Sequence, residues 1–359
     1  MNEMTAEEKL REDLKQIVPA DAGSMEKAKQ RWKTVGKPLF SLGKLEDAVI
    51  RIAGIKGKPV YSLGRKGLVI MCADNGVVAE GVTQTGQEVT AIVAENFTKK
   101  ETSVCLMAEV AGVDLFPVDI GMVTDVPAVT RPEHKVAYGT EDMMKGPAMT
   151  REQAAQAVLN GIRIVRELAE KEYDILATGE MGIGNTTTSS AVVSVLLEKD
   201  VEAVTGRGAG LSAEGLRRKV QVIREAIRLN EPDRKDALDV LAKVGGFDIA
   251  GLARVFLGGA LCHIPVMIDG FISSAAALCA VRMAPECRDY MLASHRTGET
   301  AGGMVLDVLG LSEFIDCNMS LGEGSGAVAA MPLLDMGLSV YLKMSTFEEI
   351  KVEQYEEYE

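Results

Sequence analysis

The chain has 359 residues, enough for one large domain or two, and its 47% hydrophobic and 25% charged residues are typical of a globular protein. A formal net charge of −13 argues against nucleic acid or an anionic membrane as a partner, and aromatic residues, at 4%, are too few for a base-stacking surface. The six cysteines form no C-x-x-C pair and the three histidines are scattered, so we expect a reducing, cytoplasmic location and no metal site.

The first fifty residues have helical periodicity, and we expect helices at 6–17, 24–35 and 42–54. From Gly67 onward the chain alternates between short apolar strands and helices. A capping box at 150–153 predicts a helix to about residue 171, and an apolar helix is expected at 327–336. The most apolar region, 255–281, is divided by Asp269 into pieces shorter than the roughly 20 residues of a membrane helix. Six strands are expected, at 68–73, 114–118, 173–177, 263–268, 290–293 and 314–319.

This alternation predicts an α/β fold with a doubly wound, mostly parallel sheet that is covered by helices on both faces. We expect residues 61–336 to form a Rossmann-like α/β catalytic domain. Residues 1–60 are expected to form a small helical domain together with 337–359. Ligands of such sheets bind at the carboxyl ends of the strands. The loops after the expected strands carry Asp, Glu, Asn, Ser or Gly, so we expect them to converge on one site.

The most informative loop is 178–191, Thr-Gly-Glu-Met-Gly-Ile-Gly-Asn-Thr-Thr-Thr-Ser-Ser-Ala, which follows a predicted strand. Its glycines permit close approach of a ligand, and the helix start after Gly184 favours an anion. Glu180 would repel a phosphate but suits a sugar carbon that becomes cationic. A phosphorylated sugar fits both features, whereas a glycine-rich turn with a Ser/Thr helix cap fits the spacing equally well. No Lys follows the glycines, so this is not a Walker A loop.

Glu323 lies between two glycines after a predicted strand, where an apolar pocket would raise its pKa toward that of a general base. A glycine-rich helix start with a favourable Glu is the alternative. The 206–210 loop is a second candidate phosphate cradle, and Lys219 follows it, although a run of basic residues is usually a solvated face. Asp74 and Asp269 could bind ribose hydroxyls or cap helices. Ser294-His295 lacks the G-x-S-x-G motif of a serine nucleophile.

Taken together, these motifs resemble one family, the nicotinate-nucleotide:dimethylbenzimidazole phosphoribosyltransferases of cobalamin biosynthesis. The resemblance extends from about residue 36 to about residue 338, and two of its motifs are highly specific, Gly-Glu-Met-Gly-Ile-Gly-Asn-Thr-Thr and Leu-Gly-Glu-Gly. The motifs that carry it are Asp-Asn-Gly at 74–76, Gly-Gln-Glu-Val-Thr at 86–90, the 179–188 run, Gly-Arg-Gly at 206–208, Asp-Gly at 269–270, His-Arg at 295–296 and Leu-Gly-Glu-Gly-Ser-Gly at 321–326.

The resemblance implies transfer of the phosphoribosyl group of nicotinate mononucleotide to 5,6-dimethylbenzimidazole or a related base, without a cofactor. It implies that Glu323 is the general base, with Glu180 as a second active-site acid and Lys219 near it. It also implies an α/β domain with a small helical domain, and a homodimer. The residues implied for the phosphoribosyl group are Gly182, Gly184, Asn185, Thr186, Gly208, Gly210, Asp269, Thr297 and Gly298, and those implied for the base are Gln87, Ala79, Met181 and Leu321.

Two positions depart from the family pattern. Thr297 replaces the usual Ser, which keeps the hydroxyl, and Ala79 replaces a small polar residue found in some members, which leaves the preferred base open. Two other functions stay as alternatives. A transferase that uses phosphoribosyl pyrophosphate with magnesium would need paired acids after a strand, and the loops described above contain no Asp-Asp or Glu-Asp pair apart from Glu141-Asp142. A non-catalytic nucleotide-binding regulator would have no use for Glu323.

Overall fold

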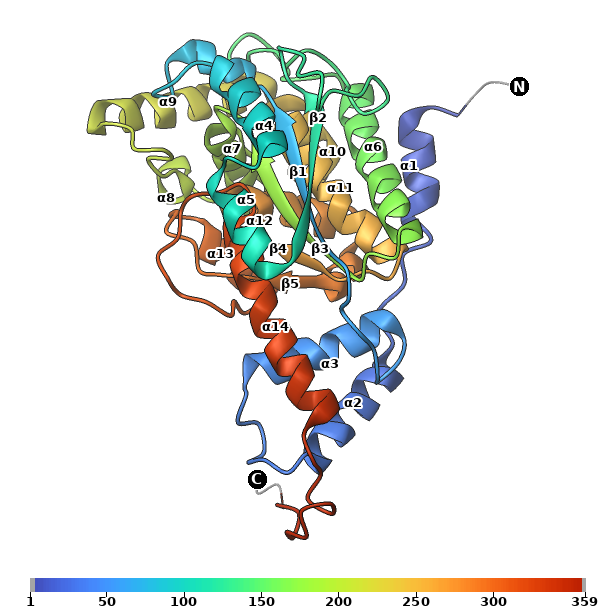
Figure 1. Cartoon of the computed structure of the whole chain (residues 1–359). Helices are drawn as coiled ribbons and strands as arrows, with labels where there is room; N and C mark the ends of the chain where they lie inside the picture. The colour runs from blue at the N-terminus through green and yellow to red at the C-terminus, as the bar shows by residue number, and fades with distance from the viewer. Residues whose placement is uncertain (1–3, 357–359) are drawn as a thin grey trace.

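The computed structural model describes residues 4–356, which contain a five-stranded parallel sheet in the order β2-β1-β3-β4-β5 (Figure 1). This order is doubly wound, with a change of winding direction between β1 and β3. Residues 1–3 and 357–359 of the two predicted terminal segments lie outside the described residues. The strands are β1 (Lys66–Ala73), β2 (Val113–Gly121), β3 (Ile175–Met181), β4 (Val266–Ile268) and β5 (Met291–Ala293).

Helices cover both faces of this sheet, which confirms the predicted α/β class. In chain order the helices are α1 (Ala6–Leu14), α2 (Ala22–Thr34), α3 (Lys44–Lys56), η1 (Gly76–Glu80), α4 (Glu88–Lys99), α5 (Ser103–Ala111), α6 (Arg151–Glu170), α7 (Asn185–Leu197), α8 (Val201–Val204), α9 (Ala213–Asn230), α10 (Ala237–Val244), α11 (Phe247–Leu261), α12 (Phe271–Met283), η2 (Pro285–Tyr290), α13 (Gly302–Leu309) and α14 (Ser325–Lys343). Helix α6 opens with the predicted capping box, in which Thr150 and Gln153 satisfy each other's backbone N–H groups.

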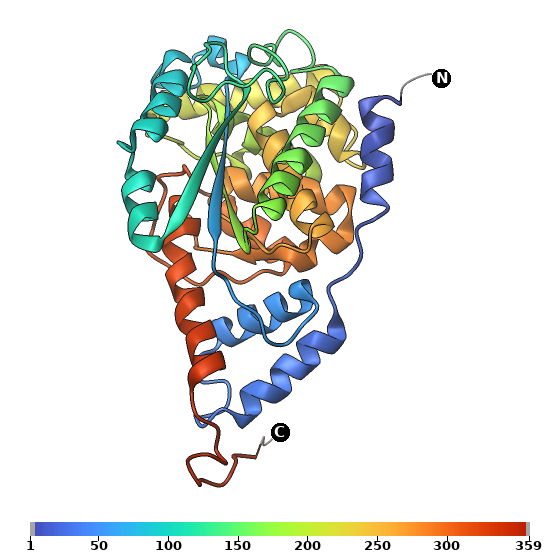
Figure 2. The same ribbon diagram turned by 45° about the vertical axis from the view of Figure 1, so that its right-hand side comes forward.

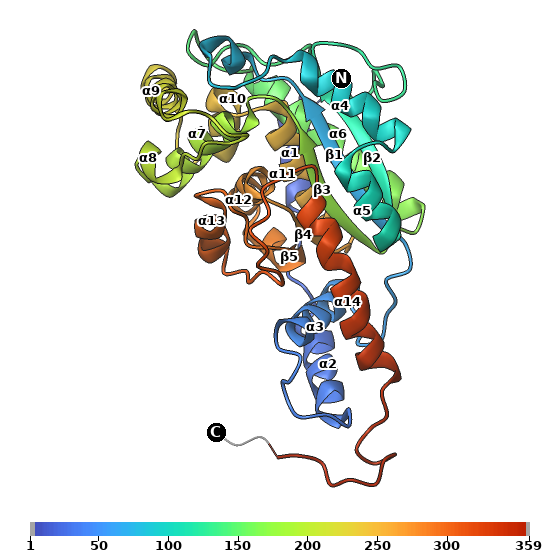
Figure 3. The same ribbon diagram turned by 60° about the vertical axis from the view of Figure 1, so that its left-hand side comes forward.

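Strand β1 shows why the sheet is covered on both faces. Its Leu68 and Ile70 belong to one apolar core with α5 and α14, whereas Val69 and Met71 belong to a second core with α6 and α11. Successive side chains of a strand point to opposite faces, so a strand that is apolar throughout needs a layer of helices on each side. Figure 3 shows α4, α5 and α14 on one side of β1 and β2.

The expected sixth strand at 314–319 is wrong. Within the described residues, Ile315 makes only an isolated parallel bridge to His295. The N–H groups of Phe314 and Ile315 both donate to the Ser294 carbonyl, and Asn318 has a positive φ of 52°. The chain therefore bends away after one pairing, before a ladder of hydrogen bonds can form.

Helix α14 extends past its predicted end at Met336 to Lys343 and runs from the sheet to α3 and α2 (Figures 1 and 3). By length and composition alone it could cross a membrane, the one such helix in 4–356. Core helices of soluble proteins pass the same test, and 56% of its apolar window is buried inside the protein. Its N-terminal half, including Val328 and Met331, belongs to the core between α5 and the sheet.

The segments from both termini meet below the sheet, where α2, α3 and the C-terminal part of α14 pack together. Trp32 of α2 and Tyr341 of α14 have ring centroids 5.0 Å apart, and Val35 forms a bridge with Thr346. Whether this group folds as a separate small domain, with boundaries at 60 and 337, remains a prediction.

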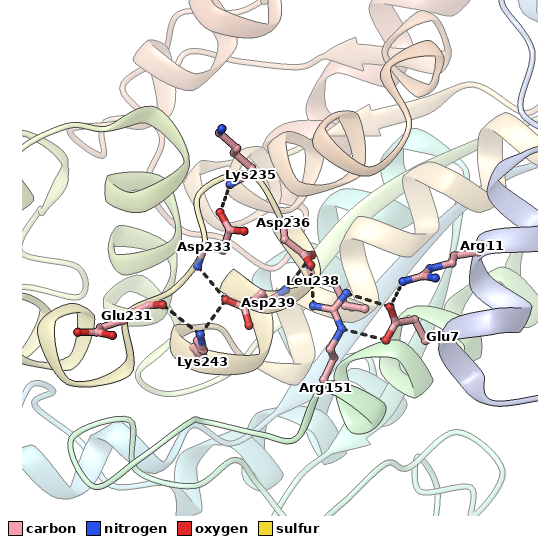
Figure 4. Close-up of polar contacts among 10 residues, drawn as sticks. All are labelled: Glu7, Arg11, Arg151, Glu231, Asp233, Lys235, Asp236, Leu238, Asp239 and Lys243. Carbon is pink, nitrogen blue, oxygen red and sulfur yellow. Dashed lines mark hydrogen bonds and ion pairs between the residues drawn. The ribbon is translucent and has the colours of Figure 1, made fainter.

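Helix α1 lies apart from α2 and α3, against α6 of the α/β layers (Figure 2). Arg151, the first residue of α6, bridges Glu7 of α1 at 2.9 Å and Asp236 at 2.7 Å (Figure 4). Asp236 in turn caps α10 by accepting from Leu238 and Asp239. The pairs are part-exposed, so each contributes little alone, but together they attach the N-terminal helix to the sheet layers.

Candidate active site

A cavity of about 240 Å³ opens at the carboxyl ends of β3, β4 and β5. A larger cavity of about 780 Å³ lies along β2 but contains none of the predicted site residues. The predicted residues that line the smaller cavity come from the ends of three strands and the segments after them, from the loop between α8 and α9, and from the loop before α14, so it is the candidate site. They are Glu180, Met181, Gly182, Asn185, Thr186, Gly208, Asp269, Thr297, Leu321 and Glu323.

Six predicted residues do not line this cavity. Gln87 donates from Nε2 to the Asn75 carbonyl at 3.0 Å, and Ala79 lies in η1. Gly184 precedes α7 with a positive φ of 95°, and the Gly298 N–H donates to the Met319 carbonyl at 2.9 Å. These four support the surrounding loops. The other two are Gly210, whose carbonyl accepts from Gln84, and Lys219.

Lys219 of α9 is buried behind the cavity wall. Its Nζ donates to Thr186 Oγ1 at 2.8 Å and to the Gly206 carbonyl at 3.2 Å. It therefore ties the start of α7 to the 206–210 loop. Burial lowers the Lys219 pKa to about 8, and the charge of Glu299 opposes this shift. A phosphate in the cavity would favour the charged form of this lysine.

Glu180 is the residue before the end of β3 and lies against the glycine-flanked loop before α14. It accepts hydrogen bonds from the Asn185 side-chain amide and from the Glu323 backbone N–H. A Cβ at Gly322 would lie 2.5 Å from Glu180 Oε1, so only glycine permits this approach. Burial raises the Glu180 pKa to about 8; Asp248 adds to the shift and the Asn185 amide opposes it. Before a ligand binds, this carboxyl group is therefore mostly protonated at neutral pH.

Glu323 has a strained backbone, and one oxygen of its carboxylate has no hydrogen bond. Its φ is +60°, a conformation that non-glycine residues rarely adopt, and its buried Oε2 has no hydrogen-bond partner. Burial raises the Glu323 pKa, while the Val104 N–H and the Thr102 hydroxyl oppose the shift. An oxygen that is buried without a partner at the cavity wall is available to accept a proton from a bound ligand.

Asp269 holds the Glu323 loop in place. Its Oδ2 accepts from the Gly324 N–H at 3.1 Å and its Oδ1 from the Ala327 N–H at 3.0 Å. Burial raises the Asp269 pKa, and nearby His295 opposes the shift. Of the two roles left open for Asp269, the structure shows helix capping, because both oxygens bind the first turn of α14.

Comparisons with known proteins agree with this geometry. A family model described as "Phosphoribosyltransferase" matches residues 17–352. The nicotinate-nucleotide–dimethylbenzimidazole phosphoribosyltransferase of Acetivibrio thermocellus is 47% identical over 92% of this chain and 95% of its own length. The enzyme of that name from Escherichia coli K12 is 42% identical over 92% of this chain and 93% of its own. The crystal structure of CobT from Thermus thermophilus superposes with a TM-score of 0.87 at 38% identity, covering 93% of this chain and all of that one.

The chain belongs to the nicotinate-nucleotide–dimethylbenzimidazole phosphoribosyltransferase family. The match to the family model extends beyond 36–338, the range over which the motifs carry the resemblance, into both terminal segments. The family resemblance from the motifs is therefore confirmed. The roles of individual site residues remain predictions.

The structure also places residues in this family member's site that the motifs did not single out. Glu299 and Ser320 line the cavity, and Phe271 and Ile272 of α12 form part of its apolar wall. Asp248, fully buried in the first turn of α11, lies behind Glu180. Glu299 could have been noticed from its position two residues after Thr297. Asp248 carries no local signal beyond the two glycines before its helix.

Gly179 of β3 supplies a steric test of this phosphoribosyltransferase site. A Cβ there would lie 2.5 Å from the Glu323 carbonyl oxygen and 3.0 Å from the Gly324 nitrogen, both backbone atoms. We expect Gly179→Ala to destabilise the protein by about 1–3 kcal/mol and to move Glu323. Gly64→Ala is the control, since a Cβ there would meet only the end of the Asp174 side chain, at 3.3 Å. Urea unfolding of both variants measures the difference, and equal stabilities would contradict the close packing of β3 against the Glu323 loop.

Proposed function

We propose that this protein transfers the phosphoribosyl group of nicotinate mononucleotide to 5,6-dimethylbenzimidazole or a related base. The products are α-ribazole 5′-phosphate and nicotinate, and the reaction serves assembly of the cobalamin nucleotide loop. The observation that carries the proposal is the meeting of Glu180 and Glu323, from two separate loops, at one cavity that also contains the glycine-rich start of α7. Membership of the family supports the same reaction.

The reaction needs one general base and no general acid. A nitrogen of the base attacks C1′ from the face opposite nicotinate, and the bond from C1′ to the pyridinium nitrogen breaks. The bonding pair returns to that nitrogen, so nicotinate leaves without needing a proton. The attacking base becomes cationic and must lose the proton on its other nitrogen. Glu323 accepts this proton, since its Oε2 has no other partner within the described structure.

The other residues have complementary roles in this proposal. The N–H groups at the start of α7 and the hydroxyl groups of Thr186 and Thr297 bind the phosphate, which Lys219 supports from behind. Gly182, Asn185, Gly208 and Ala209 form the walls around the phosphate and ribose. Glu180 faces the region of C1′, where its negative charge would stabilise an oxocarbenium-like transition state.

The base would occupy the apolar side of the cavity, beside Met181 and Leu321. Gln87 and Ala79 do not line the cavity. Ala79 lies in η1 and Gln87 bonds the Asn75 carbonyl just before η1, so both would affect binding of the base only through the position of η1. Leu321 is 51% exposed at the mouth, so a bound base would remain open to solvent on one side unless another chain covers it. An apolar, incompletely enclosed pocket is compatible with several benzimidazoles.

We further propose that the protein is a cytoplasmic homodimer. On α5, beside Glu323, Leu106 and Val110 are 60% and 88% exposed, an apolar strip that a second subunit would cover. Analytical ultracentrifugation at micromolar concentration tests the dimer, and a purely monomeric protein would refute it. Partners other than these substrates and a second copy are not proposed, and neither nucleic acid nor a membrane is expected.

The decisive experiment combines the purified protein with nicotinate mononucleotide and a series of bases, with product masses read out. Formation of α-ribazole phosphate and nicotinate supports the proposal. Product formed only from phosphoribosyl pyrophosphate would favour that class of transferase instead. Nucleotide binding without any product would favour a regulator.

Turnover should be insensitive to chelators. The reaction releases no pyrophosphate, so there is no polyphosphate leaving group for magnesium to neutralise. Within residues 4–356 no three His, Cys, Asp or Glu side chains are grouped to hold a metal ion. We expect the initial rate in EDTA to stay within about two-fold of the untreated rate. A two-fold change corresponds to much less than the roughly 1.4 kcal/mol of activation barrier that changes a rate 10-fold. Loss of activity in EDTA that magnesium restores would argue for the pyrophosphate-dependent alternative.

A further inference from the structure

The two aspartates expected to bind ribose hydroxyl groups are both engaged elsewhere. Both carboxylate oxygens of Asp269 accept backbone N–H groups, from Gly324 at 3.1 Å and from Ala327 at 3.0 Å. Asp74 does not line the cavity, and its Oδ2 accepts from the Val123 N–H at 2.8 Å. A cavity that encloses a ribose needs another polar group for the hydroxyls, because a buried hydroxyl group without a partner is costly.

The segment after β5 supplies polar side chains to the cavity at alternate positions. His295, Thr297 and Glu299 line the cavity, whereas Arg296 does not and bonds Glu313 instead, at 3.0 Å. Side chains two residues apart on an extended chain share a face and are separated by about 7 Å. Thr297 is the residue proposed for the phosphate, so His295 lies one such step from the phosphate, toward β5. The ribose hydroxyls of a nucleotide lie at a comparable distance from its phosphate.

The His295 ring is fixed against the first turn of α14, the helix that follows the Glu323 loop. The residue is 3% exposed, and its Nδ1 lies 2.9 Å from the Ser294 hydroxyl oxygen. A Cβ on Gly326, the second residue of α14, would lie 2.0 Å from the same nitrogen, so only glycine allows the ring this position. The imidazole and Glu323 are therefore held by the same end of α14, and both line the cavity.

The surroundings of the ring determine which of its nitrogens carries the hydrogen. Ser294 is fully buried, and within residues 4–356 its hydroxyl group bonds only His295. We assign the hydrogen of that bond to the serine, because a buried hydroxyl group with no acceptor would be costly. Nδ1 is then the acceptor and Nε2 carries the ring hydrogen. Nε2 has no protein partner in the described residues and is not sealed from solvent, so it presents an N–H donor to the cavity.

We propose that His295 binds a ribose hydroxyl group of the nucleotide by donating from Nε2, and that it thereby selects ribonucleotides over deoxyribonucleotides. The inference rests on the proposed function, which places a phosphoribosyl group in this cavity. The bond holds the sugar between the phosphate at the start of α7 and the carboxylate of Glu323. It therefore fixes the direction in which C1′ faces the attacking base.

Ligand analogues and a His295 variant together test this bond. The ligands are nicotinate mononucleotide and its 2′-deoxy and 3′-deoxy analogues, and their affinities for the full-length protein are measured by calorimetry. For the wild type, we expect one deoxy analogue to bind on the order of 10-fold more weakly than the ribonucleotide. In His295→Ala the ribonucleotide should bind on the order of 10-fold more weakly than in the wild type, and the same deoxy analogue should differ from it by less than about two-fold.

Further variants separate loss of the bond from damage to the fold. His295→Gln, whose side-chain amide can donate from a similar position, should keep part of the discrimination. Ser294→Ala retains the ring but removes the hydroxyl group that directs its hydrogen, so its discrimination should lie between those of the wild type and His295→Ala. His263→Asn is the control, because His263 is exposed, does not line the cavity and has a positive φ of 53° that asparagine tolerates. It should leave the discrimination unchanged.

The outcomes distinguish this inference from the proposed function. Equal discrimination by the wild type and by folded His295→Ala, or no discrimination by the wild type, would overturn the assignment of His295. Discriminating binding without any product would instead refute the proposed function and leave the assignment of His295 standing. A wild type that binds none of the three nucleotides would refute both. Where product forms, the ratio of kcat/KM for the ribonucleotide and the deoxy analogue should fall in His295→Ala by the same factor as the ratio of affinities.

Discussion

Glu323→Gln is expected to lower kcat by about 10²–10⁴-fold, or roughly 3–5 kcal/mol of barrier, the range of general-base catalysis. Glutamine retains the size of the side chain and its hydrogen-bonding capacity but accepts no proton at neutral pH. The affinity for nicotinate mononucleotide should change little, since in the proposed site phosphate and ribose would contact the α7 start and the loop at Gly208. Single-turnover rates and equilibrium binding of the nucleotide separate the two effects.

The same variant distinguishes base catalysis from distortion of the loop. The +60° φ of Glu323 should be equally accessible to Gln, so thermal stability should stay close to that of the wild type. The defect should also shrink for a base that is already deprotonated when it attacks. A variant with near-normal rates would make Glu180 the leading candidate for the general base, and our assignment of Glu323 would be wrong.

Glu180→Gln is expected to lower the reaction rate and, above about pH 4.5, to raise the stability of the fold. In the proposed mechanism the variant would lose the negative charge facing C1′, and removal of one preorganised electrostatic group typically costs about 10²–10³-fold in rate. The folded-state pKa of Glu180 is raised from 4.5 to about 8, so its stabilising contribution is complete below pH 4.5 and is lost as the pH rises through 8. Glutamine does not titrate and avoids this loss.

We therefore expect the stability of Glu180→Gln relative to the wild type to rise between pH 4.5 and 8, by a total on the order of 5 kcal/mol at pH 8.5. Urea unfolding of both proteins at pH 5, 7 and 8.5 measures this difference. Glu225→Gln, at a half-exposed position of α9, is the control and should show no such trend. A stability difference that does not vary with pH would show that burial does not raise the Glu180 pKa.

Local patterns in the sequence predicted most of the sheet and the family. The strands β1 to β5 are apolar segments followed by glycine or polar residues, and this pattern is visible one strand at a time. The failed strand at 314–319 has the same pattern. A strand also needs continuous pairing along its length, however. Within the described residues, this segment pairs with its neighbour at Ile315 and again only through the Met319 carbonyl, on either side of the positive φ at Asn318.

The extent of α14 is another property that the local pattern did not determine. The apolar pattern suggested an end at Met336, but burial against the core and contact with α2 and α3 continue the helix to Lys343. Pro332 lies inside this helix without ending it. Tertiary packing of the apolar face outweighs the local preference, because most helix stability in proteins comes from such packing.

The sequence by itself determined the identities of Glu180 and Glu323 as candidates, because each lies next to glycines after a predicted strand and within a specific family motif. Only the tertiary structure decided the protonation and orientation of these two side chains. The proximity of Glu180 to Asp248, the bonding of Lys219 to Thr186 and the capping of α14 by Asp269 join residues that are far apart in the chain. Protonation and orientation depend on burial and on charges across space, so they are set by the assembled fold and not by sequence spacing.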